Sequence, residues 1–78
     1  LVKPLNVYPN PNSGKLTVEN SPENSIFELY DIVGRKVYSN TVGNVTQLDL
    51  SPFNNGTYLY KIIKDNKIIK EDKLIINK

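Results

Sequence analysis

The sequence predicts an all-β protein, an immunoglobulin-like β-sandwich of about seven antiparallel strands. Composition is the first reason: Ala, the strongest helix former, is missing, whereas eight Ile, seven Val and five Tyr suit a pleated sheet. Pattern is the second reason, because short alternating stretches recur with turn signals about every eight to twelve residues. Length is the third, since 78 residues amount to one small domain with a thin core.

Two strands are predicted before residue 20. Residues 5–8 alternate between apolar and polar and stop at residues 9–14, where Pro, Asn, Ser and Gly predict an ordered loop. Residues 15–19 alternate strictly and place Leu16 and Val18 on one face. This period of two is typical of strands with one buried face.

A β-hairpin is predicted next. Residues 25–31 alternate, the chain turns at residues 32–34, and it returns through residues 35–38. Asp31 stands immediately before the turn. We expect its carboxylate to bond turn amides rather than to carry chemistry.

Three further segments complete the predicted sandwich. A polar turn at residues 40–44 precedes a strand at residues 45–50. Residues 57–64 form the longest β pattern and are expected to lie centrally, buried on both faces apart from their lysines. Asp65 and Asn66 then suit a two-residue hairpin turn before a last strand in residues 67–78.

The residue inventory excludes most catalytic chemistry. The chain has no Cys and no His, so disulfides, thiolate or imidazole zinc ligands and His-activated nucleophiles are ruled out. Glu28 with Asp49, or Glu71 with Asp72, are the candidate carboxylate pairs. We interpret them as surface charges, because so small a sandwich has little volume for a cleft. The prediction is a protein that is not an enzyme, with no metal site and no cofactor.

Positive charge gathers at the C-terminal end of the chain. Residues 61–78 hold six Lys against three acidic groups, whereas residues 1–60 hold four basic groups against five acidic ones. Arg35 is the only arginine, so the basic end lacks what nucleic-acid binding requires. No apolar run reaches the roughly 18 residues of a membrane span. We therefore predict no nucleic-acid partner and no integral membrane segment.

Four tyrosines leave two interpretations open. Tyr30, Tyr38, Tyr58 and Tyr60 either form an aromatic platform for a sugar, or fill the core with hydroxyls that reach its rim. The second interpretation is favoured, because a domain with so few apolar side chains needs nearly all of them for folding.

Four motifs in a fixed order carry a family resemblance. They are Tyr8-Pro9-Asn10-Pro11, Phe27-Glu28-Leu29-Tyr30-Asp31-Ile32-Val33-Gly34-Arg35-Lys36-Val37, Leu48-Asp49-Leu50-Ser51-Pro52-Phe53-Asn54-Asn55-Gly56-Thr57-Tyr58, and a final Lys-Leu-Ile-Ile-Asn-Lys. Together they resemble the C-terminal sorting domain (type A) of cargo of the type IX secretion system in Bacteroidetes. The resemblance covers residues 7–78.

The resemblance implies a non-catalytic secretion signal. Residues 1–4 are then the end of a linker from an upstream passenger protein, and residues 5–78 are a single C-terminal sorting domain. The expected partners are the type IX outer-membrane translocon and a sortase-like peptidase, which removes the domain or anchors the cargo. The expected location is the periplasm in transit, then the cell surface or the extracellular medium.

Two sets of residues are assigned on this basis. Motif residues with structural roles are Pro9, Asn10, Pro11, Asp31, Gly34, Lys36, Gly56 and Tyr58. The candidates for translocon recognition are Lys70, Lys73, Leu74, Ile75, Ile76 and Lys78, on a terminal strand whose exposed edge is expected to pair with a receptor strand. The alternatives are a carbohydrate-binding or adhesive immunoglobulin-like accessory module of a secreted enzyme, and a structural spacer.

Overall fold

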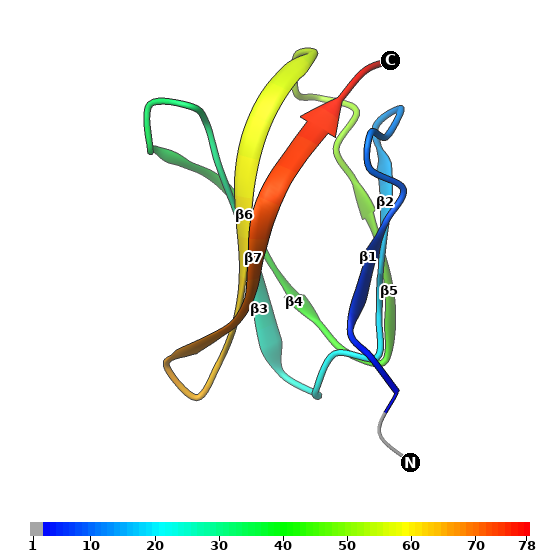
Figure 1. Ribbon diagram of the computed structural model, residues 1–78, viewed down its shortest axis with the longest axis vertical. Helices are drawn as coiled ribbons and strands as arrows, with labels where there is room; N and C mark the ends of the chain where they lie inside the picture. Colours follow the sequence, from blue (N-terminus) through cyan, green and yellow to red (C-terminus); the bar gives the residue numbers. More distant parts are fainter. Residues whose placement is uncertain (1–2) are drawn as a thin grey trace.

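Seven strands form two sheets that pack face to face (Figure 1). The computed structural model describes residues 3–78, so residues 1 and 2 of the expected linker lie outside the described residues. The strands are β1 (Asn6–Tyr8), β2 (Lys15–Glu19), β3 (Ser25–Tyr30), β4 (Lys36–Val42), β5 (Val45–Asp49), β6 (Gly56–Lys64) and β7 (Lys67–Ile76). Across residues 3–78 there is no helix that could cross a membrane. The predicted all-β sandwich is confirmed.

The strand order is immunoglobulin-like. One sheet has the order β1-β2-β5 and the other β4-β3-β6-β7, and every pair of neighbouring strands is antiparallel. Strands A, B and E of an immunoglobulin-like domain correspond to the first sheet, and strands C′, C, F and G to the second. The final strand β7 therefore lies at an edge.

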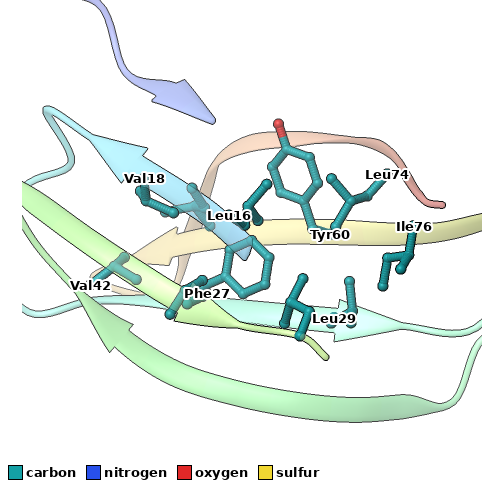
Figure 2. Packing of buried hydrophobic residues seen from close by; sticks show 11 residues of the cluster. Leu16, Val18, Phe27, Leu29, Val42, Tyr60, Leu74 and Ile76 are labelled. Carbon is teal, nitrogen blue, oxygen red and sulfur yellow. The ribbon is translucent and has the colours of Figure 1, made fainter. Parts of the chain in front are cut away.

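The core lies between the sheets and follows the alternation of the strands. Figure 2 shows side chains from β2, β3, β6 and β7 that meet there. The buried apolar cluster comprises Leu16, Val18, Phe27, Leu29, Val42, Leu48, Leu50, Tyr60, Ile62, Leu74 and Ile76. Because side chains on a strand point alternately to its two faces, one apolar face on each strand is enough to build this core.

Strand β6 lies centrally in its sheet, as predicted, but it is not buried on both faces. Its inward side chains Tyr60 and Ile62 are buried, whereas Leu59 on the outer face is 50% exposed. No element covers the outer face within residues 3–78, because both layers of the sandwich are sheets. The continuous apolar run was therefore wrongly read as two buried faces.

Strand β4 is longer than the sequence predicts. It continues through the polar residues that were assigned to a turn and ends at Val42, which is buried opposite Ser25. As an edge strand, β4 leaves polar side chains in contact with solvent while its backbone pairs with β3. Tertiary pairing outweighs the local turn preference of these residues.

The hairpin between β6 and β7 has the predicted two-residue turn. Asp65 and Asn66 both have positive φ, 51° and 63°. A type I′ turn requires this conformation at both positions, and Asp and Asn adopt it more readily than other residues with a side chain.

Candidate functional site

The edge strand β7 presents two different rows of side chains. Leu74 and Ile76 point into the core and are buried, and Lys73 on the opposite face is exposed. Main-chain groups alternate as well: those of one residue bond to β6, and those of the next point away from the sheet. One row of main-chain groups on β7 is therefore not used by the sheet.

The C-terminal half of that edge is already occupied by the loop between β1 and β2. The N–H of Ile75 donates to Oδ1 of Asn10 (3.0 Å), and Nδ2 of Asn10 donates to the carbonyl of Lys73 (2.8 Å). The N–H of Asn12 donates to the carbonyl of Ile75 (2.9 Å), and the N–H of Asn77 donates to the carbonyl of Asn12 (2.8 Å). We call residues 10–12 the asparagine clamp.

The other half of the edge, towards the β6–β7 turn, remains open. Because Lys73 and Ile75 direct their main-chain groups outward, alternation directs those of Glu71 outward too. Within residues 3–78, no hydrogen bond from beyond β6 reaches the N–H or carbonyl of Glu71. Ile68 and Ile69 beside it are exposed. A strand from another protein could pair here without displacing the clamp.

Three lysines lie on β7 itself: Lys67, Lys70 and Lys73. On the neighbouring strand β6, Nζ of Lys61 lies over the Tyr30 ring, and Nζ of Lys64 donates to the carbonyl of Glu23 (2.6 Å). Lys78 lies beyond the strand, where its N–H donates to Oδ1 of Asn55 (2.9 Å) and its Nζ to the carbonyl of Ser51 (2.8 Å). The six recognition residues predicted from sequence thus fall into three groups. The side chains of Lys70, Lys73 and Lys78 reach solvent, those of Leu74 and Ile76 form core, and Ile75 is half-buried with its main chain bonded by the asparagine clamp.

The β3–β4 turn is organised by Asp31. Its Oδ1 accepts the N–H groups of Val33 (3.0 Å) and Arg35 (2.9 Å), and its Oδ2 accepts Nε of Arg35 (2.9 Å). These contacts, led by the main-chain N–H of Arg35, hold the pKa of the Asp31 carboxyl below its ordinary value. Gly34 has φ +98°, which favours glycine at this position. The expectation that Asp31 bonds turn amides is confirmed.

The outer face of the four-stranded sheet carries a network of polar side chains that the sequence analysis does not predict. The hydroxyl of Tyr30 donates to Oε1 of Glu28 (2.6 Å), and Nζ of Lys36 donates to Oε2 (3.1 Å). The hydrogen bond from Tyr30 is the main reason that the pKa of the Glu28 carboxyl is lowered. Nζ of Lys61 lies 4.8 Å from the centre of the Tyr30 ring. Residues two apart on one strand share a face, so the spacing of Glu28 and Tyr30 was the available signal.

Next to this network lies a hollow of about 420 Å³. It extends from the β3–β4 turn across β6 to β7. Its lining residues are Tyr30, Gly34, Leu59, Tyr60, Lys61, Glu71, Asp72 and Lys73. The hollow therefore joins two features that are far apart in sequence, the hairpin tip and the edge strand.

Three of the four candidate tyrosines pack in or against the core. Phe27 stacks on Tyr60 at 5.5 Å between ring centres and meets Tyr38 edge-on at 6.3 Å. Tyr58 meets Phe53 edge-on, and its hydroxyl donates to the carbonyl of Asn54 (2.7 Å). Tyr30, on the outer face, is held by Glu28. This packing disfavours the sugar platform.

The structure separates one candidate carboxylate pair and leaves the other exposed. Glu28 lies on the four-stranded sheet and Asp49 on the three-stranded sheet, so the sandwich separates them. Glu71 and Asp72 are neighbours on β7, and both are exposed. Among residues 3–78 there is no group of three or more acidic side chains that could hold a metal ion.

The fold and these surfaces define a small immunoglobulin-like domain, with an edge strand and a hydrogen-bonded turn among its exposed features. The sequence profile of one family, described as the secretion system C-terminal sorting domain, matches residues 6–77. The chain belongs to this family, whose members are C-terminal signals of type IX secretion and are in general not catalytic. No curated protein matches the chain. Membership implies that the domain works with the type IX machinery to export an upstream cargo to the cell surface or beyond.

Proposed function

We propose that residues 5–78 bring a passenger protein, joined through residues 1–4, to the type IX outer-membrane translocon. The observation that carries this proposal is the match to the sorting-domain family over residues 6–77. The passenger passes through the periplasm before it reaches the cell surface or the medium.

A sortase-like peptidase then removes the domain or anchors the cargo at the surface. Cleavage upstream of residue 5 fits the structure best, since Leu5 packs against the core and β1 begins at Asn6. Cutting there leaves the sandwich intact, so the signal can fold before it is removed.

The recognition surface is the open half of the β7 edge with its lysines. Lys70 and Lys73 attract acidic groups of the receptor, and the main chain at Glu71 pairs with a receptor strand. Lys78 adds positive charge beyond the clamped end of the strand. Leu74 and Ile76 contribute indirectly, because their buried side chains anchor β7 to the core. The main chain of Ile75 is bonded to the asparagine clamp. Deletion of residues 73–78 would therefore test folding as much as recognition, and point variants are the sharper test.

A proline at position 71 tests the strand pairing. Proline is tolerated on an edge strand where its missing N–H faces solvent, so Glu71→Pro removes the outward donor and leaves the β6 ladder intact. Glu71→Ala is the matched control, because it removes the same carboxylate and keeps the N–H. We expect Glu71→Pro to lose export and Glu71→Ala to keep it. Equal export of the two variants would contradict strand pairing at this position.

A fusion tests the sorting function itself. Residues 1–78 are appended to a fluorescent reporter with a signal peptide in a Bacteroidetes host, and the medium and cell surface are assayed. We expect export that is lost in a translocon-deficient strain. A folded reporter that stays in the periplasm would contradict the proposal, and would favour the spacer or the accessory module instead.

A further inference from the structure

The tip of the β3–β4 hairpin exposes two apolar side chains at positions where turns usually have polar residues or glycine. Ile32 and Val33 are each 78% exposed, more than any other large apolar side chain among the described residues. They occupy the two central positions of the turn that Asp31 and Gly34 close. Turns favour Pro, Asn, Asp, Ser and Gly, so two β-branched apolar residues contribute nothing to this one. Such departures from local preference are expected at functional positions.

The tip is rigid and projects from the sandwich. The N–H of Gly34 donates to the carbonyl of Asp31 (3.0 Å), and the N–H of Asp31 donates to the carbonyl of Arg35 (2.9 Å). The N–H of Val33 donates to Oδ1 of Asp31 (3.0 Å). In Figure 1 the tip is the green loop at the upper left, away from the body of the fold. A preorganised tip loses little conformational entropy when a partner binds it.

The tip borders the same hollow as the edge strand. Gly34 lines the hollow at one side, Glu71 and Lys73 of β7 line it at another, and the half-exposed Leu59 lies on β6 between them. A protein that contacts the Glu71 and Lys73 side of this hollow would therefore reach Gly34 at the base of the tip. This continuity indicates a single contact surface.

We propose that the protein that recognises the β7 edge also binds Ile32 and Val33, and that these two side chains enter an apolar pocket on that protein. The inference rests on the proposed sorting function. Its partner has an apolar pocket for two β-branched side chains, bordered by polar groups that complement the mixed charges of Lys61, Glu71 and Lys73. A lipid surface fits less well, because the tip carries no Trp or Phe, Asp31 lies in the turn, and Glu71 and Asp72 line the adjoining hollow.

The test replaces the tip with ordinary turn residues. Ile32→Asn with Val33→Ser favours the turn, so thermal unfolding of the 78-residue chain should be unchanged. In the reporter fusion we expect export to fall about tenfold or more, since burial of each aliphatic side chain in a partner is worth at least that factor in affinity. Val45→Ser, at a 64% exposed apolar side chain of the other sheet, should export normally. The conservative swap Ile32→Val with Val33→Ile should also keep export.

Each result bears on one claim. Undiminished, translocon-dependent export of the Ile32→Asn, Val33→Ser variant would overturn the tip contact and leave the sorting function standing. Failure of the unchanged domain to export would contradict the sorting function, and the tip contact with it. Flotation of the unchanged chain with anionic phospholipid vesicles, lost in the tip variant, would assign the tip to lipid and overturn the protein contact.

Discussion

Asn10 and Ile75, 65 residues apart in the chain, are joined by a hydrogen bond of 3.0 Å from the N–H of Ile75 to the side chain of Asn10. Asn10 stands between Pro9 and Pro11, which have no N–H to offer a further strand. The clamp therefore does two things: it holds the C-terminal strand, and it ends the sheet on that side. Proline on an edge is one of the ways in which proteins prevent unwanted strand pairing.

Asn12→Ala should destabilise the domain by about 1–3 kcal/mol. Asn12 is buried, and its Oδ1 accepts the N–H of Gly14 at 2.8 Å, so the alanine variant leaves a buried donor without a partner. Urea denaturation gives the free energy of unfolding. Asn54→Ala is the control, since that side chain is exposed and should change stability by less than about 0.5 kcal/mol. Equal stability of the two variants would show that the clamp is not structural.

Gly14→Ala should cost more stability than Gly34→Ala. Both glycines have positive φ, +109° and +98°, which alone costs an L-residue about 1–2 kcal/mol. A Cβ at position 14 would also lie 3.2 Å from Cα of Ser51, which overpacking data put at about 1–3 kcal/mol more, whereas nothing lies within 4 Å at position 34. Thermal unfolding of the two variants in parallel measures the difference. A smaller loss of stability for Gly14→Ala than for Gly34→Ala would contradict this prediction. It would mean that the loop at Ser51 shifts to make room for the added methyl group.

The stability of the domain should fall at alkaline pH through Tyr60. Burial, with the negative charge of Asp72 as a second cause, raises the pKa of its phenol from 10.0 to about 12. Because the folded state resists deprotonation, this contribution is fully present below pH 10 and is lost as pH rises towards 12. Tyr60→Phe should lose less stability in this interval, as measured by denaturation at pH 9, 10 and 11. A parallel decline in both proteins would assign the effect to other groups.

How far the sequence predicts this structure depends on the kind of interaction. The alternation of Leu16 with Val18, and the turn at Asp65 and Asn66, are local signals, and the corresponding strand and hairpin are confirmed. The exposed face of β6 was missed, because an apolar run of residues does not reveal whether another layer covers it. Composition cannot reveal such coverage either, since it depends on how distant strands are arranged.

The candidate site was predicted in outline only. Lysines on a terminal strand could be recognised from the sequence, and β7 is indeed an edge strand. That Asn10 and Asn12 occupy half of the edge depends on contacts more than 60 residues apart, for which a single sequence has no signal. The turn at residues 32–34 was predicted and is confirmed, but the sequence has no signal for the exposure of Ile32 and Val33, because it does not show which elements surround a turn.

The most direct test of the account compares two charge-matched variants in the reporter fusion. Lys70→Gln with Lys73→Gln neutralises the proposed recognition edge, and Lys3→Gln with Lys15→Gln removes the same charge from the other side of the domain. Because charges at the rim of an interface act mainly on the rate of association, the edge variant should export several-fold less reporter, and the difference should shrink as ionic strength rises. Equal export of the two variants would contradict recognition at β7.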